Sequence, residues 1–325
     1  YEANSRFAVI EADEYAIDPT ENRSPRLSLL NPFHIVCTNA EHDHPDIYAT
    51  EDDALEMYAE FINKLPGIGG LTITAKSYSR LQSRIGVIEH LMVLDSEPSL
   101  LSSDIQIEES QCATLSPTRY ASNSIQASLR LHDRTVELEI TIPGEHNMIN
   151  AAMAFLACDA LGLPESEILS AIKRFKSTLR RLDDHGTINK THWFDDYGHH
   201  PIEVKAVIES LRKWLPNHTI GVVFESHTFS RTKQFFTEFV DALATADEVY
   251  VLDIFPSARE PFDSTVSSDQ LVQELEKKGI KSTNLKTIDG AVEFFSKSTD
   301  HAQVILTLGA GNVYQIIDKL KLLVQ

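Results

Sequence analysis

Short apolar runs alternate with helix-patterned segments through the second half of the chain, and this alternation constrains the fold more than any other feature. The pattern begins at about Thr178, where strand-like runs are followed by apolar residues at helical spacing. The predicted strands are Ile220 to Phe224, Val249 to Asp253 and Val304 to Leu308, and the predicted helices begin near Thr232, Ser267, Gly290 and Asn312. Such an order predicts an α/β fold with a doubly wound, mainly parallel sheet.

The first half of the chain predicts a second α/β region that ends in a β-hairpin. Buried strands are predicted at Phe7 to Ile10, His34 to Thr38 and Gly70 to Ala75, with an amphipathic helix around Leu55 to Leu65. Alternating polarity from Ser124 to Ile142 predicts a hairpin that turns at Leu131 to Arg134, and helices follow from Asn147 and after Pro164. We therefore expect two domains, residues 1–178 and 179–325, joined by a short hinge near Lys176 to Leu179.

Composition narrows the classes of partner. The chain has 325 residues, 42% of them hydrophobic, and a formal net charge of −19. So acidic a chain has little affinity for phosphate backbones, which argues against nucleic acid and anionic membranes as partners. No apolar run is long enough for membrane insertion, and Cys37, Cys112 and Cys158 are widely spaced. We expect a cytoplasmic protein without a zinc site.

The segment Asp195-Asp196-Tyr197-Gly198-His199-His200-Pro201 places two carboxylates, a phenol and two imidazoles between a strand-like run and a helix. Polar residues at the carboxyl end of a strand lie where open α/β sheets bind their ligands. The alternative interpretation is that an aspartate caps the helix and the histidines are solvated turn residues. Capping needs only one short polar side chain, so the cluster favours a functional site.

Two polar clusters follow the first two predicted strands. Glu11, Asp13 and Glu14 are hard oxygen ligands suited to Mg²⁺, although acidic residues at a strand end are more often solvated. His44 ends the second cluster, which begins at Asn39, and alone it is more typical of a hydrogen-bonded loop histidine. Because neighbouring strand ends converge, the two clusters are expected to share one crevice.

Further candidates lie at helix starts and turns. Asn147 and Asn150 share one face at the start of a helix and can bracket a polar ligand. The guanidinium groups of Arg180, Arg181 and Arg231 suit capture of phosphate or carboxylate, with a solubilising surface role as the alternative. The turn Gly309-Ala310-Gly311-Asn312 lacks full dinucleotide-binding spacing and favours a tight turn.

Taken in order, these motifs resemble those of the Mur ligases. They are E-A-D-E at 11–14, T-N-A-E-H-D-H at 38–44, G-E-H-N-M-I-N at 144–150, R-R at 180–181, D-D-Y-G-H-H-P at 195–201 and H-T-F-S-R-T at 227–232. The last two are most similar to the branch that joins L-alanine to UDP-N-acetylmuramate. The resemblance implies that residues 1–178 are the remainder of a central ATPase domain, and that residues 179–325 are a Rossmann-like carboxy-terminal domain that binds the amino acid and ATP.

The resemblance also implies roles for single residues. Glu11 and His44 would bind Mg²⁺, and Asn147 and Asn150 would line the adenine pocket. Arg181 would contact a phosphate of ATP and Asp196 its ribose. Tyr197, His199 and Arg231 would position L-alanine and the acyl intermediate. Two positions depart from the family pattern. The chain has Leu182 where the family usually has Phe, and Thr228 where the family often has Arg. The threonine makes the amino-acid pocket less cationic.

The implied reaction is an ATP-dependent ligation in peptidoglycan synthesis. ATP phosphorylates the lactyl carboxylate of UDP-N-acetylmuramate, and the amine of L-alanine attacks the acyl phosphate. Two alternatives remain, a recycling ligase that attaches a whole peptide to the same sugar and a non-catalytic remnant that binds ligand weakly. The chain opens at Tyr1 and contains no G-x-x-x-x-G-K-[ST] loop for ATP phosphates, so we expect a fragment that is inactive alone.

Overall fold

The computed structural model describes residues 5–18, 21–42, 47–96, 107–121, 124–256, 262–298 and 300–324. The chain divides into two compact units, and each is described by itself. Unit 1 comprises Tyr1–Arg119, Ile125–Ile140 and His146–Arg174, and unit 2 comprises Tyr120–Ser124, Thr141–Glu145 and Phe175–Gln325. The domain boundary predicted between residues 178 and 179 stays a prediction.

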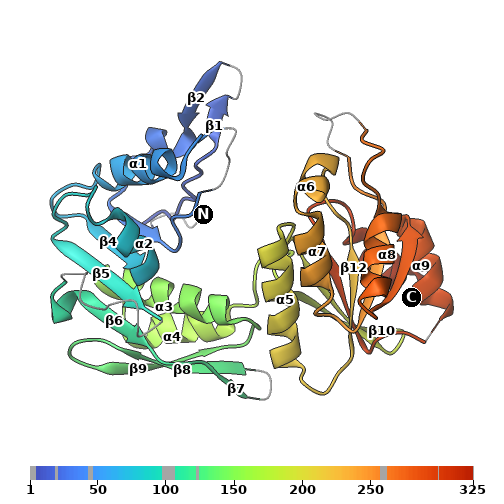
Figure 1. Cartoon of the computed structure of the whole chain (residues 1–325). Helices are drawn as coiled ribbons and strands as arrows, with labels where there is room; N and C mark the ends of the chain where they lie inside the picture. The colour runs from blue at the N-terminus through green and yellow to red at the C-terminus, as the bar shows by residue number, and fades with distance from the viewer. Residues whose placement is uncertain are drawn as a thin grey trace. The chain divides into compact units, whose positions relative to one another are not determined.

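Unit 1 contains a mixed sheet in the order β3-β4-β5-β6-β8-β7, with β9 paired to β8 (Figure 1). Strands β3 to β6 are parallel, whereas β8 runs antiparallel to β6 and β9. The strands are β3 His34–Cys37, β4 Gly70–Thr74, β5 His90–Asp95, β6 Cys112–Leu115, β7 Arg119–Ala121, β8 Ser124–Arg130 and β9 Thr135–Ile140. The predicted hairpin is confirmed as β8–β9, and the amide of Leu131 donates to the carbonyl of Arg134 across its turn at 2.8 Å.

Helices cover the apolar side chains of this sheet. They are α1 Glu51–Ile62, α2 Ala75–Leu81, α3 Glu145–Ala160 and α4 Glu165–Arg174, with short 3-10 helices η1 Arg26–Leu29 and η2 Glu109–Gln111. Phe61 of α1 and Leu81 of α2 are buried in one cluster with Leu71 and Ile73 of β4. Helices α3 and α4 confirm the two helices predicted after the hairpin.

The prediction of a buried strand at Phe7 to Ile10 is wrong. Residues 5–14 have no regular secondary structure, and the side chains of Val9 and Ile10 are exposed. None of the described strands pairs with this segment, and an apolar run becomes a strand only when its backbone groups find a partner. The next residues form a small antiparallel pair, β1 Ala16–Asp18 and β2 Asn22–Pro25. The strand predicted at His34 to Thr38 is confirmed as β3 but is only half buried.

Unit 2 contains a six-stranded sheet in the order β10-β11-β15-β12-β13-β14. Only β10 is antiparallel to its neighbour, so the predicted doubly wound, mainly parallel sheet is confirmed. The strands are β10 Asp183–Ile188, β11 Thr191–Asp196, β12 Ile220–Phe224, β13 Glu248–Leu252, β14 Lys281–Lys286 and β15 Val304–Leu308. Because β15 returns between β11 and β12, the winding reverses there, and ligands of open α/β sheets bind at such points.

Two hydrophobic cores sandwich this sheet. The helices are α5 Pro201–Trp214, α6 Phe229–Gln234, α7 Phe236–Leu243, α8 Ser268–Lys277, α9 Ile288–Lys297 and α10 Gln315–Val324. Leu211 of α5 and Phe239 of α7 belong to the core that packs on one face. Trp193 of β11, Phe295 of α9 and Ile316 of α10 belong to the core on the other. Burial on both faces explains why the central strands read as continuous apolar runs.

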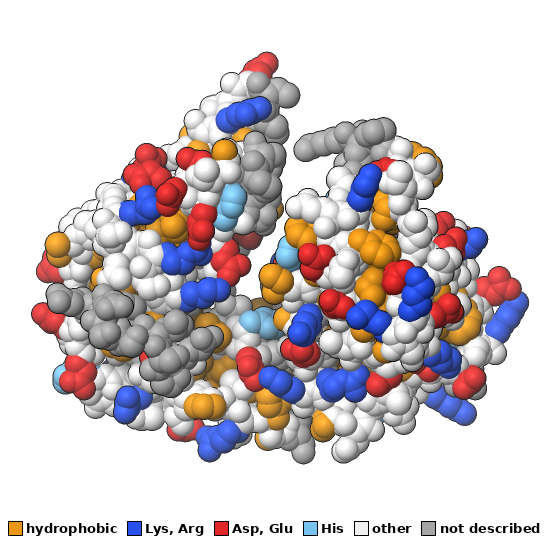
Figure 2. Space-filling model, in the orientation of Figure 1, with side chains coloured by type: hydrophobic (Ala, Val, Ile, Leu, Met, Phe, Trp, Pro, Cys, Tyr) orange, Lys and Arg blue, Asp and Glu red, His pale blue; other side chains and the backbone are white. Residues whose placement is uncertain are grey.

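None of the described helices is long and apolar enough to cross a bilayer. On the face drawn in Figure 2, lysine and arginine side chains are interspersed with aspartate and glutamate on each unit.

Candidate active site

The loops that follow β11, β15 and β12 meet at the carboxyl edge of the unit 2 sheet. The amide of Gly309 donates to the carbonyl of Asp196 at 3.2 Å, and the amide of Glu225 donates to the carbonyl of Leu308 at 3.0 Å. Segments that lie far apart in the sequence are thereby brought to one place. It is the edge predicted to bind ligand.

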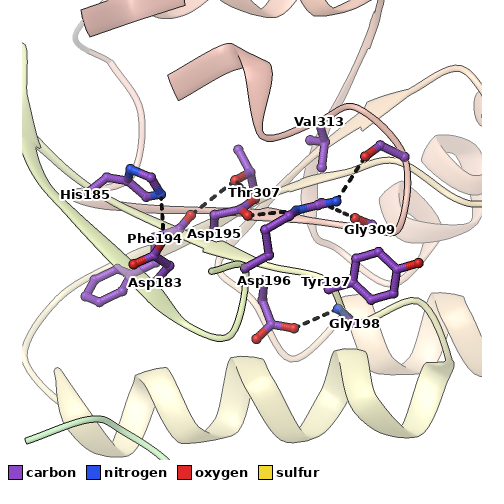
Figure 3. A network of polar contacts seen from close by, with 12 residues as sticks. Asp183, His185, Phe194, Asp195, Asp196, Tyr197, Gly198, Thr307, Gly309 and Val313 are labelled. Carbon is purple, nitrogen blue, oxygen red and sulfur yellow. Dashed lines mark hydrogen bonds and ion pairs between the residues drawn. The ribbon is translucent and has the colours of Figure 1, made fainter. Parts of the chain in front are cut away.

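Asp196 lies inside this edge, with 4% of its surface exposed. One carboxylate oxygen accepts from the amide of Gly198 at 2.7 Å (Figure 3). The other accepts from the amide of Leu182 at 2.8 Å. Burial raises the pKa of Asp196 to about 6, although both amides favour the ionised form. A carboxylate has about four acceptor positions, and the two amides occupy two of them.

The raised pKa of Asp196 predicts that unit 2 loses stability as the pH rises through about 6. The ordinary pKa is 3.8, so between these values the folded chain holds a proton that the unfolded chain releases. The stabilisation is complete below pH 3.8 and is lost above the folded pKa. Urea denaturation of the wild type and Asp196→Asn should show their difference in unfolding free energy falling by about 2 kcal/mol between pH 4.5 and 7.5. A difference independent of pH contradicts this prediction.

Tyr197, His199 and His227 form an aromatic cluster next to Asp196. The ring centroids of Tyr197 and His199 are 5.2 Å apart, and those of His199 and His227 are 6.5 Å apart. Burial lowers the pKa of His199, and the positive charge of Arg231 lowers it further, whereas Glu203 opposes the shift. The imidazole is therefore neutral near pH 7. Its Nδ1 lies 3.3 Å from the carbonyl oxygen of Tyr197, which favours the tautomer with Nε2 as proton acceptor.

His200 caps the helix instead of contributing to this cluster. Its Nδ1 accepts from the amide of Ile202, and Glu203 accepts from the amides of His199 and His200 at 3.0 and 3.1 Å. Pro201 occupies the first turn of α5 as predicted. The alternative interpretation, in which an aspartate caps the helix, is therefore wrong, because the cap is His200.

The paired arginines have different surroundings. Arg181 is exposed, and its guanidinium carbon lies 5.8 Å from the ring centroid of Tyr197. Arg180 turns inward and binds Asp195, which was quoted in the motif but given no role of its own. The carboxylate of Glu225 and the hydroxyl of Thr307 also lie here and were missed by the sequence reasoning. Their only sequence signal is a polar residue in or directly after a buried strand.

The remaining predicted residues belong to unit 1. Asn147 is partly buried and Asn150 is exposed, three positions apart in the first turns of α3. Glu11 is exposed, and His44 lies outside the described residues. Tyr48 joins the two polar clusters, because its hydroxyl donates to the carbonyl of Glu14 at 2.7 Å and its own carbonyl lies 2.8 Å from His42 Nε2. Within the described ranges, no three His, Cys, Asp or Glu side chains are grouped as a metal site.

Comparison with known families and structures agrees with this fold. The Mur ligase middle domain matches residues 1–158, and the Mur ligase glutamate ligase domain matches residues 180–311. The chain belongs to the Mur ligase family. The α/β architecture predicted for both halves is therefore confirmed.

Several sequence relatives of the chain share one printed name. The UDP-N-acetylmuramate--L-alanine ligase of Clostridium acetobutylicum is 31% identical over 96% of the chain. The crystal structure of the UDP-N-acetylmuramate-alanine ligase of Thermotoga maritima matches with a TM-score of 0.71 at 20% identity, over 91% of this chain and 60% of that one. The MurF ligase of the same organism, in complex with ADP, matches with a TM-score of 0.63 at 16% identity, over 90% and 62%. The chain spans 64 to 66% of the length of the curated relatives that it matches.

Proposed function

We propose that the chain is the nucleotide- and amino-acid-binding part of an ATP-dependent ligase that joins L-alanine to UDP-N-acetylmuramate in peptidoglycan synthesis. The observation that carries this proposal is the cluster of Tyr197, His199 and His227 beside the buried Asp196, at the switch point of the unit 2 sheet. The positive charge of Arg231 acts on His199 of this cluster. The name shared by the sequence relatives supports the choice of L-alanine. The three free cysteines are consistent with a cytoplasmic location.

The cluster has the chemistry that an amino-acid substrate needs. The guanidinium of Arg231 suits the carboxylate of L-alanine, and the ring of Tyr197 provides an apolar wall for the methyl group. Attack on an acyl phosphate requires a neutral amine. His199 holds its Nε2 ready to accept the ammonium proton, because burial and Arg231 keep the imidazole neutral.

Contacts to ATP are proposed for each unit separately. In this proposal Asp196 accepts from the ribose hydroxyls, the exposed Arg181 meets a phosphate, and Asn147 and Asn150 contact the adenine. Mg²⁺ is commonly held by one or two carboxylates together with phosphates and water, and the exposed carboxylate of Glu11 fits that role, with His44 as the second residue proposed. When bound, Mg²⁺ neutralises charge on the phosphoryl oxygens.

The proposal is tested with the purified gene product that contains this chain. Phosphate release from ATP should require UDP-N-acetylmuramate and L-alanine together. The tripeptide used by recycling ligases should not replace L-alanine. Arg231→Ala should raise the KM for L-alanine by about a hundredfold, since a charge-assisted contact contributes roughly 1.5–3 kcal/mol. The matched control is Lys233→Ala, on the same helix but paired with the surface carboxylate of Asp263. Release that depends on the tripeptide, or no release at all, overturns the proposal.

A further inference from the structure

Arg180 is held inside unit 2 by three hydrogen bonds to two segments. Its Nε donates to the carboxylate of Asp195 at 3.0 Å, and its two terminal nitrogens donate to the carbonyls of Gly309 and Gly311, the latter at 3.1 Å (Figure 3). Asp195 is 1% exposed and also accepts from the hydroxyl of Thr307 at 2.6 Å. One guanidinium thus fastens the end of β11 to the turn after β15.

Aromatic rings enclose the same guanidinium. Its central carbon lies 5.1 Å from the ring centroid of Tyr197 and 4.7 Å from that of Tyr314. Only 21% of the Arg180 side chain is exposed. Tyr197 is a predicted substrate contact. Because its ring packs on the guanidinium of Arg180, the position of the ring depends on Arg180, which is largely buried.

The turn at Gly309 to Asn312 holds a carboxylate of the chain itself. Glu225, 5% exposed, accepts from the amide of Val313 at 2.9 Å and from the amide of Asn312. A Cβ atom on Gly311 would lie 2.2 Å from the nearer oxygen of Glu225, which explains the glycine. In glycine-rich turns that bind nucleotides, backbone amides of this kind face a phosphate. Here they face a glutamate.

We propose that Arg180 and Glu225 are positioning residues at the carboxyl edge of the unit 2 sheet. The carboxylate of Glu225 occupies the position in the glycine turn where a bound anion would lie. Arg180 connects that turn to β11 and to Tyr197. The turn is then a fixed wall of the site, and ATP phosphate is held elsewhere. The kinetic test of this inference rests on the proposed ligase function, whereas the structural test does not.

The alternative, in which Arg180 itself binds phosphate, has a clear physical cost. The guanidinium would have to leave two carbonyls and the carboxylate of Asp195. That carboxylate would then stay buried without its cation, which is strongly destabilising. Arg181, exposed next to Arg180 in the chain, can reach a ligand without any such loss.

The test compares Arg180→Lys with Arg212→Lys. Lysine keeps the charge of Arg180 but lacks the planar fork that reaches three acceptors. Arg212 is the matched control, because it also donates to a backbone carbonyl and a carboxylate, those of Thr245 and Asp247, on the surface of unit 2. In the gene product, Arg180→Lys should lower kcat by about a hundredfold through misplacement of reacting groups, with the KM for ATP within about threefold of the wild type. Arg212→Lys should leave both unchanged.

Amide hydrogen exchange provides a second readout that does not depend on activity. Arg180→Lys and Glu225→Gln should each speed exchange across residues 309–313 at least tenfold, because both loosen the same turn, and Arg212→Lys should not. Wild-type exchange in these variants overturns the positioning role, whatever the activity. A rise in the KM for ATP with unchanged kcat overturns it in favour of direct phosphate binding by Arg180. A wild-type enzyme without ligase activity would contradict the proposed function and leave the exchange test intact.

Discussion

Replacing Asp196 with alanine should lower ATP-dependent turnover of the gene product by about a thousandfold, which corresponds to about 4 kcal/mol of transition-state stabilisation. The substitution removes the proposed acceptor for the ribose hydroxyls. It also leaves the buried amides of Leu182 and Gly198 without an acceptor, and each unsatisfied group costs about 1–3 kcal/mol. The loop that carries Tyr197 and His199 loses its anchor as a result. Steady-state kinetics with ATP as the varied substrate measures the effect.

Asp184→Ala is the control for this prediction. Asp184 also lies in the unit 2 sheet and also accepts a hydrogen bond, from His192 at 2.6 Å, but its side chain is 57% exposed. Its removal should leave turnover within twofold of the wild type. If Asp196→Ala folds normally and retains more than a tenth of the wild-type turnover, the assignment of Asp196 to the nucleotide site is wrong.

The sequence predicted unit 2 well because burial dictates its pattern. Strands covered on both faces, such as β12 and β15, are short apolar runs between helical segments, and their order leaves few topologies open. Strand β14 was missed because five of its six residues, Lys281 to Lys286, are polar and the strand is only partly buried at the edge of the sheet. The strand prediction at Phe7 to Ile10 was wrong for the opposite reason. An apolar run does not indicate whether a partner strand is available.

The sequence predicted which motifs form the site, but it did not predict how their side chains are arranged. Sequence spacing placed Asp196, Tyr197 and His199 at a strand end, which the structure confirms. Residue type and spacing did not distinguish the two arginines at 180–181, and only the family resemblance selected Arg181. The inward orientation of Arg180 depends on Asp195 and on carbonyls some 130 residues away. Glu225 was invisible for the same reason. Its partners are backbone amides, and backbone amides leave no mark in the sequence.

Replacing Gly309 with alanine should lower the free energy of unfolding of unit 2 by about 3–5 kcal/mol. Its φ of 144° lies in a region that side chains rarely adopt, and an added Cβ would lie 2.2 Å from the carbonyl oxygen of Glu225. That oxygen belongs to the backbone, so no side-chain rotation can relieve the clash. The turn must shift instead, and the hydrogen bonds from Gly309 to Asp196 and from Arg180 to Gly309 are weakened together. Urea denaturation measures the loss.

Gly279→Ala separates the clash from the backbone conformation. Gly279 also has a positive φ, 81°, but no atom lies within 4 Å of an added Cβ, so alanine there should cost only the conformational strain of about 1–2 kcal/mol. The difference between the two variants then measures the close approach of Glu225 to the glycine turn. Equal losses in both would mean that the turn can yield, and a turn that yields could not serve as the fixed wall that orients Tyr197.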